Sequence, residues 1–230
     1  MPNHDQIYSS EAETYHGMIS RQGSLEAYIE EIRPFDGLDI VDVGAGTGRF
    51  TVQLAQRAKH ITALDVSKSM LNVTARRLTE AGLTNWTTKT ADHRQLLLED
   101  NSADLIIAGW TICYTVNSSN PEWEHDLSVI FAEMKRVLRP GGTIIIFETM
   151  GTGNETPEPP HYLTDYYKSL VEKYSFSHRW IRTDYQFNSL TEAKEAARFF
   201  FSEELVDRIE RNNWVRLPEC AGIWWLHVQG

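Results

Sequence analysis

Three glycines on alternate positions constrain this chain more than any other feature of its sequence. They stand in the stretch VDVGAGTGRF, residues 41–50, between a short β-branched run and apolar residues at helical spacing. This pattern predicts a strand, a tight turn and a helix. Glycine permits positive φ and lets the backbone approach a ligand, and the first helical turn offers unpaired N–H groups to a polar or anionic group. The stretch therefore predicts a ligand site at the turn.

The spacing of the glycines narrows the class of ligand. A dinucleotide-binding turn has the pattern G-x-G-x-x-G, which Gly44 and Gly46 would fit, but its sixth position is Arg49, and Gly48 comes one place early. A phosphate-binding loop would need Gly-Lys-Ser or Gly-Lys-Thr, which is absent. Asp42 completes the pattern D-x-G-x-G-x-G. This pattern resembles the first motif of the class I S-adenosylmethionine-dependent methyltransferases.

Composition and charge set the broad class of protein. The chain has 230 residues and a formal net charge of −10. This length suits one domain, and the acidic balance argues mildly against a nonspecific nucleic-acid binder, which needs a basic face. Cys113 and Cys220 form no disulfide or metal-ligand pattern, and the polar start is no signal peptide. No apolar run reaches the roughly 18 residues of a membrane span, so we expect a cytoplasmic protein.

Acidic residues follow the next two predicted strands. Asp65 ends a strand over residues 61–64, and Asp92 follows a strand over residues 86–91. In a doubly wound sheet, the carboxyl ends of these strands lie beside the glycine turn. The resemblance implies that Asp65 accepts from the ribose hydroxyls, where a helix cap is the alternative. It also implies that Asp92 accepts from the adenine amino group, where a turn-forming aspartate is the alternative.

The resemblance implies a wider set of cofactor contacts, drawn from the N-terminal segment, the glycine turn and the ends of the following strands. Tyr15 corresponds to an aromatic residue that folds over the cofactor in this family, and Arg21 could meet the cofactor carboxylate. Trp110 follows a buried strand that begins at residue 104, and its ring could attract a cation or simply pack. The expected cofactor contacts are Asp42, Gly44, Ala45, Gly46, Gly48, Asp65, Val66, Met70, Asp92, His93, Gly109, Trp110 and Tyr15.

A second motif strengthens the resemblance. The stretch VLRPGG, residues 137–142, ends an amphipathic helical pattern and precedes a β-branched strand over residues 143–148. It is similar to the branch of the family that holds quinone-biosynthesis and other small-molecule enzymes. The matching motifs cover residues 38–149. The implied fold is α/β, a Rossmann-like doubly wound sheet of seven mostly parallel strands with the last strand antiparallel.

The remaining segments complete one domain over residues 1–230. We expect an N-terminal cap over residues 1–35, the cofactor-binding core over residues 38–149 and a small lid on the acceptor site over residues 150–180. The lid is inferred because this segment leaves a strand carboxyl end and begins with Gly, Pro, Thr and Glu. Residues 181–230 are expected to hold helices and further strands. Strands are predicted over residues 180–187, 214–217 and 222–228, the last two closing the sheet.

The chemistry implied by the resemblance is transfer of a methyl group from S-adenosylmethionine to a small-molecule acceptor by in-line displacement. The sulfonium is a good leaving group, so desolvation and alignment can supply much of the rate. The sequence assigns no catalytic residue. His161, His125 and Glu148 are candidate bases, because each could lie near the strand ends.

Several alternatives stay open. Residues 109–112 read GWTI where enzymes that methylate nucleic-acid amino groups carry Asn/Asp-Pro-Pro-Tyr/Phe. The acidic metal ligands of catechol-type enzymes are also absent there, so the sequence argues against a nucleic-acid acceptor and against a metal. A protein or RNA methyltransferase, a non-catalytic S-adenosylmethionine-binding protein and a nicotinamide oxidoreductase are the alternative functions. The sequence does not identify the acceptor, the methylated atom or the oligomeric state.

Overall fold

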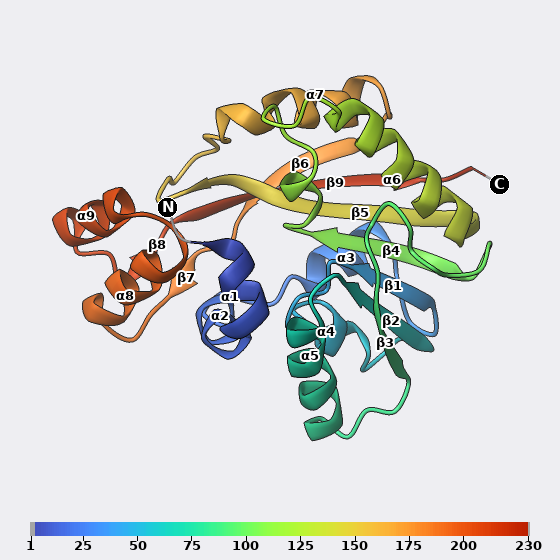
Figure 1. Ribbon diagram of the computed structural model, residues 1–230, viewed down its shortest axis with the longest axis horizontal. Helices are drawn as coiled ribbons and strands as arrows, with labels where there is room; N and C mark the ends of the chain where they lie inside the picture. Colours follow the sequence, from blue (N-terminus) through green and yellow to red (C-terminus); the bar gives the residue numbers. More distant parts are fainter. Residues whose placement is uncertain (1–2, 230) are drawn as a thin grey trace.

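A seven-stranded sheet runs through the centre of the molecule in the computed structural model, which describes residues 3–229 (Figure 1). Its strands are β1 (Asp39–Val43), β2 (His60–Asp65), β3 (Trp86–Thr90), β4 (Ala103–Gly109), β5 (Leu138–Thr152), β6 (Ser177–Arg182) and β9 (Glu219–His227). Their order is β3-β2-β1-β4-β5-β9-β6. Strands β1 to β5 are parallel, and β9 runs antiparallel between β5 and β6. The predicted Rossmann-like sheet with an antiparallel last strand is confirmed.

Helices cover both faces of this sheet (Figure 1). They are α3 (Glu26–Ile32), α4 (Thr51–Leu54), α5 (Lys68–Glu80), α6 (Trp123–Val137) and α7 (Thr164–Glu172). Side chains alternate along a strand, so Ile40 of β1 packs in the apolar cluster of α3 and α4, whereas Val41 and Val43 pack in that of α6 and α7. The strand order reverses between β1 and β4, and this reversal opens a crevice at the carboxyl ends of those strands.

The C-terminal part builds a separate two-stranded sheet, which contradicts two predictions. Strand β7 (Tyr185–Gln186) pairs with β8 (Arg216–Leu217) outside the main sheet. The strand predicted over residues 180–187 is therefore broken into β6 and β7, and the one over residues 214–217 does not close the main sheet. Helices α8 (Leu190–Phe200) and α9 (Glu203–Asn212) pack with the small sheet in one apolar cluster.

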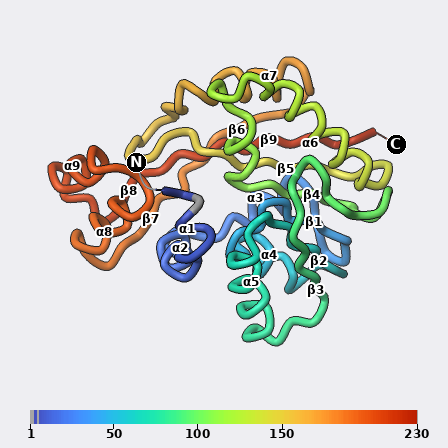
Figure 2. Tube along the Cα trace, viewed as in Figure 1, coloured from blue at the N-terminus to red at the C-terminus, as the bar shows by residue number. Residues whose placement is uncertain are grey.

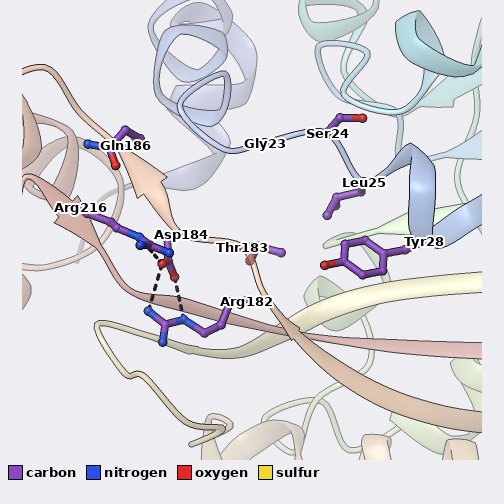
Figure 3. Close-up of a pocket in the computed structure, with 9 residues that line it drawn as sticks. All are labelled: Gly23, Ser24, Leu25, Tyr28, Arg182, Thr183, Asp184, Gln186 and Arg216. Atoms are coloured by element: carbon purple, nitrogen blue, oxygen red, sulfur yellow. Dashed lines mark hydrogen bonds and ion pairs between the residues drawn. The ribbon is translucent and has the colours of Figure 1, made fainter.

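Two local features explain these breaks. Asp184 follows β6, and its carboxylate accepts hydrogen bonds from the side chains of Arg182 and Arg216 and from the N–H of Glu219. Figure 3 shows this aspartate between the two arginines, where the chain leaves β6. Pro218 separates β8 from β9 and has no N–H to donate to a strand neighbour. The local hydrogen bonds and the proline thus end the strands that the apolar pattern alone would continue.

The N-terminal segment folds as two short helices, α1 (His4–Ser10) and α2 (Ala12–Ile19). Figure 2 shows this blue segment between α5 on one side and the α8–α9 unit on the other. Met18 and Ile19 pack in the cluster of α8 and α9, and Tyr8 and Tyr15 pack against Met70 of α5. The segment expected as a cap therefore joins the main sheet layer to the C-terminal unit.

The segment expected as a lid, residues 150–180, is divided between core and loop. Strand β5 continues to Thr152, and α7 packs Tyr166 and Leu170 into the main apolar cluster. Between these elements, residues 153–163 are irregular and end in the 3₁₀ turn η2 (His161–Leu163). Across residues 3–229, no helix has the length and apolar character that a membrane span requires.

Candidate functional site

The glycine turn leaves the carboxyl end of β1 in a conformation that requires glycine. Gly44 and Gly46 have φ of +67° and +54°. A Cβ atom on Gly44 would lie 2.1 Å from Oγ1 of Thr111, so this position also excludes any side chain. The N–H of Gly48 donates to the carbonyl of Ala45 at 2.9 Å and closes the turn. The backbone of β1 thus reaches the crevice without side chains in between.

The side chain of Asp42, in β1, holds this turn through hydrogen bonds to the residue that follows it. Its Oδ2 accepts from the N–H of Thr51 at 3.0 Å and from the hydroxyl of Thr51 at 2.6 Å, which ties β1 to the start of α4. Burial raises the pKa of Asp42 to about 7. Asp42 and Gly48, both expected as cofactor contacts, line neither of the two cavities described below. Both residues make hydrogen bonds that hold the turn.

Asp65 joins the end of β2 to the same turn. Its Oδ2 accepts from the N–H of Gly46 at 2.8 Å, and its Oδ1 accepts from the N–H of Ser67 at 2.8 Å. Burial raises the pKa of this carboxyl group. Asp65 lines the cavity beside the turn, so its oxygens can accept further bonds from a ligand there.

A first cavity, of about 240 Å³, lies in the crevice at the ends of β1, β2 and β4. We call it the turn cavity. The expected cofactor contacts that line it are Tyr15, Gly44, Gly46, Asp65, Val66, Met70, Asp92, His93, Gly109 and Trp110. Ala45 lines the neighbouring cavity instead. The structure therefore brings together side chains that the sequence distributes over nearly a hundred positions.

Asp92 is bound by a neighbour that the sequence analysis did not consider. Nε of Arg94 donates to Oδ1 of Asp92 at 2.9 Å, and Nη2 donates to Oδ2 at 2.8 Å. The guanidinium holds the pKa of Asp92 at about 2. Next to it, Nε2 of His93 lies 2.8 Å from Oγ1 of Thr115, and burial lowers the pKa of this histidine. The acidic end of the turn cavity is thus a partly exposed ion pair beside a neutral imidazole.

A second cavity, of about 690 Å³, adjoins the first. We call it the large cavity. The two share wall residues at the glycine turn and the end of β4, including Gly44 and Trp110. Distant segments supply aromatic and apolar walls: His4 from α1, Tyr162 from the loop before α7, and Phe200 from α8. The rings of His4 and Phe200 stack at 4.6 Å between centroids, so α1 and α8 meet over this cavity.

Two charged side chains in the large cavity were missed from the sequence. The guanidinium carbon of Arg49 lies 3.9 Å from the ring centroid of Trp110, and its Nη2 is buried with no hydrogen-bond partner among the described residues. Glu219 is 3% exposed; its Oε1 accepts from the hydroxyl of Thr149 at 3.2 Å, and its Oε2 has no partner there. Burial lowers the pKa of Arg49 and raises that of Glu219 to about 7.

One signal in the sequence could have located Glu219. Because β9 is antiparallel, its first residue lies at the same edge as the carboxyl ends of the parallel strands. A carboxylate at the start of the last strand is therefore equivalent in position to one at the end of a parallel strand. Arg49 lies within the glycine motif itself, where its position argues only against a dinucleotide-binding pattern.

The candidate bases and Arg21 lie elsewhere. His125 and His161 are exposed and line neither cavity. Glu148 is fully buried behind the cavity wall, where its Oε1 accepts from the N–H of Cys113 at 3.1 Å and burial raises its pKa to about 7. Arg21, expected as a partner of the cofactor carboxylate, pairs with Glu192 at 2.5 Å and lines neither cavity.

Comparison with known proteins points to one family. Residues 41–146 match a family model described as a methyltransferase domain. The chain is 35% identical over 118 residues to the malonyl-[acyl-carrier protein] O-methyltransferase of Serratia marcescens, which covers 51% of this chain and 40% of that protein. It is 30% identical over 116 residues to the demethylmenaquinone methyltransferase of Listeria monocytogenes, covering 49% of this chain and 45% of the relative. The chain thus spans less than half the length of these curated relatives.

The fold comparison extends over more of the chain. The crystal structure of a SAM dependent methyltransferase from Aquifex aeolicus superposes with a TM-score of 0.58 at 18% identity. The superposition covers 88% of this chain and 89% of that one. At this identity the likeness concerns the fold, and it includes the segments outside residues 41–146.

Proposed function

Residues 41–146 match a methyltransferase domain, and from this match we propose that the chain is a class I methyltransferase that transfers a methyl group from S-adenosylmethionine to a small-molecule acceptor. The observation that carries the proposal is the connection between the glycine turn and Asp65. A turn with glycines at positions 44 and 46 and a half-buried carboxylate meet at the point where the strand order reverses. This is the place where open α/β sheets bind ligands.

The residues of the turn cavity fit an adenosine group. Asp65 would accept from the ribose hydroxyls, and the open backbone at Gly44 and Gly46 would let the ligand lie against β1. Val66, Met70, Asp92 and His93 would surround the base. Gly109 and Trp110 line the junction with the large cavity, so they would lie near the sulfonium. Tyr15 would cover the ligand from the N-terminal segment.

The bound cofactor would supply a methyl group attached to a sulfonium. The methyl carbon needs no further activation, because the sulfonium is a good leaving group. What remains for the protein is to align the acceptor and to exclude water. The aromatic cover made by Tyr8, Tyr114 and Phe200 serves the second task, since the hydroxyls of Tyr8 and Tyr114 bond at 2.5 Å and the ring of Phe200 packs beside Tyr15. Trp110 lines both cavities, so its ring would lie where the cofactor and the acceptor meet and would limit how the acceptor can be placed.

A small acceptor is favoured by the size and walls of the large cavity. A volume of about 690 Å³ lies within the range of sites for drug-sized ligands, roughly 300–1,000 Å³. Residues of α1, α8 and the loop before α7 line it on several sides, whereas a protein or RNA acceptor would need a long open groove. Both cysteines are free thiols, so we assign the activity to a reducing compartment, the cytoplasm.

The first experiment is calorimetry with S-adenosylmethionine, S-adenosylhomocysteine and NAD. We expect micromolar binding of the first two and none of NAD, followed by transfer of a labelled methyl group to compounds of an acceptor screen. Binding of NAD alone would overturn the proposal. Binding without transfer to any acceptor would favour a cofactor-binding protein that lacks transferase activity.

A further inference from the structure

Arg49 and Glu219 are opposite charges that line the same cavity without pairing with each other. Both belong to the wall of the large cavity, and neither lines the turn cavity. Among the described residues, no ion pair within 4.0 Å joins them. Each keeps a buried polar atom without a partner, Nη2 of Arg49 and Oε2 of Glu219.

Two other arginines of this protein illustrate the usual pairing with carboxylates. Arg57 contacts Glu26, Glu30 and Asp36, and Arg182 binds Asp184 through two nitrogens. A buried charge without a partner costs several kcal/mol unless something else compensates it. The ring of Trp110 offers Arg49 a partial compensation, but it cannot accept the guanidinium N–H groups in their plane. A ligand with complementary groups would satisfy both residues.

We propose that Arg49 and Glu219 are the two polar contacts of the acceptor site, and that the acceptor is an aromatic carboxylic acid. Its carboxylate binds the guanidinium of Arg49, and its hydroxyl or amine donates a hydrogen bond to Glu219. This inference rests on the proposed function, because it assigns the large cavity to the methyl acceptor.

The chemistry of the site favours a carboxylate over a phosphate. A planar guanidinium matches one carboxylate through two parallel hydrogen bonds. A phosphate carries up to two negative charges and would face one cation and the nearby carboxylate of Glu219. The rest of the cavity favours a flat ring, because its walls include Phe50, Tyr185 and Phe201.

The amino-acid end of the cofactor also carries a carboxylate, so it is the other possible partner of Arg49. The position of Arg49 favours the acceptor, because this residue lines the large cavity and not the turn cavity. The two sources separate in a binding experiment. Methylthioadenosine has the adenosine and the sulfur of S-adenosylhomocysteine but lacks the amino-acid tail.

The test measures calorimetric affinities of para-hydroxybenzoate and para-hydroxybenzamide, with and without saturating S-adenosylhomocysteine. The two probes differ in the carboxylate alone. In the wild-type protein we expect the acid to bind at least about tenfold more tightly than the amide, the equivalent of one charge-assisted hydrogen bond. Arg49→Gln should remove this preference, Arg49→Lys should keep part of it, and Arg211→Gln on the exposed end of α9 is the matched control.

A second pair of probes tests Glu219. Para-methoxybenzoate lacks the donor that para-hydroxybenzoate carries, so the wild-type protein should prefer the hydroxyl compound by a fewfold or more and Glu219→Gln should narrow the difference. Equal affinity of the acid and the amide in the wild-type protein would overturn the proposal. So would a loss of S-adenosylhomocysteine affinity in Arg49→Gln with methylthioadenosine affinity unchanged, because Arg49 would then bind the cofactor tail. Failure of the proposed function would show separately, as absence of S-adenosylhomocysteine binding in the wild-type protein.

Discussion

The two ends of the binding crevice use carboxylates in different ways. Asp65, at the end of β2, has both oxygens bonded to backbone N–H groups of Gly46 and Ser67. Glu219, at the start of β9, has one oxygen bonded to Thr149 and the other without a partner among the described residues. Asp65 is half-buried and Glu219 is buried, and both carboxyl groups have raised pKa values. At the turn cavity, backbone N–H groups of the protein therefore satisfy the carboxylate. At the large cavity, one carboxylate oxygen can still bind a ligand.

The contrast follows from how each end is assembled. Around Asp65, the turn cavity consists of β1, the glycine turn and the end of β2, so the nearby peptide N–H groups of Gly46 and Ser67 satisfy the carboxylate oxygens. The large cavity draws its walls from α1, α8, the loop before α7 and strands that are distant in sequence, among them β5 and β9. Its charges have no backbone partners of this kind. We infer that the turn end accepts one fixed ligand and that the specificity of this chain lies in the large cavity.

The largest expected effect would come from breaking the turn itself. Gly44→Ala puts a Cβ atom 2.1 Å from Oγ1 of Thr111 at positive φ, whereas Gly46→Ala has no atom within 4 Å and meets the φ strain alone. We expect Gly44→Ala to lose about 2–5 kcal/mol of unfolding free energy from overpacking plus backbone strain. Gly46→Ala should lose about 1–2 kcal/mol. Urea unfolding measures both, and equal losses would contradict the steric role of Thr111.

The next largest effect concerns Asp65. Replacing it with Ala leaves the N–H groups of Gly46 and Ser67 without their acceptor, at about 1–3 kcal/mol each. We expect S-adenosylmethionine affinity to fall by about 100-fold or more, the equivalent of 2.8 kcal/mol. Asp65→Asn keeps one acceptor oxygen and should lose less. Asp100→Ala, whose carboxylate binds Arg136 on the surface, is the control and should bind like the wild-type protein.

The sequence predicted which residues lie beside the glycine turn, because their positions depend on local pattern. Alternating glycines, Asp65 and Asp92 could each be assigned from the strand that precedes them, and the order of the main sheet followed from the same motifs. The large cavity could not be predicted in this way. Its walls depend on how α1 and α8 meet over the crevice, and the strand breaks at Asp184 and Pro218 come from tertiary hydrogen bonds and a missing N–H.

Glu219 should make the stability of the folded protein depend on pH. Its pKa in the folded protein is about 7, above the usual 4.5, so the folded state keeps a proton that the unfolded state loses between these values. Stability therefore falls as pH rises through this window. We expect Glu219→Gln to be more stable than the wild-type protein at pH ~8 by about 1–3 kcal/mol, and to gain little at pH ~4. Thermal unfolding at both pH values measures this difference.

A matched variant separates stability from ligand binding. Glu148 is buried with the same raised pKa but lies behind the wall of the large cavity. Glu148→Gln should therefore show a similar gain in stability at high pH, while the preference for para-hydroxybenzoate over para-methoxybenzoate stays unchanged. A loss of that preference in Glu148→Gln would contradict the distinction between the two carboxylates.

The smallest expected effect is at Asp92, at the partly exposed side of the turn cavity. Its carboxylate is bonded to Arg94, and the two side chains are 38% and 44% exposed, so the pair itself contributes little stability. Asp92→Asn keeps an acceptor oxygen for an adenine amino group, and we expect S-adenosylmethionine affinity to fall by about 2–10-fold, one ordinary hydrogen bond. With a pKa of about 2, Asp92 stays ionised from about pH 4 upward, so it should add no pH dependence to binding in calorimetry. A 100-fold loss in Asp92→Asn would mean that ligand binding displaces Arg94 and that this carboxylate belongs with Asp65 among the essential partners.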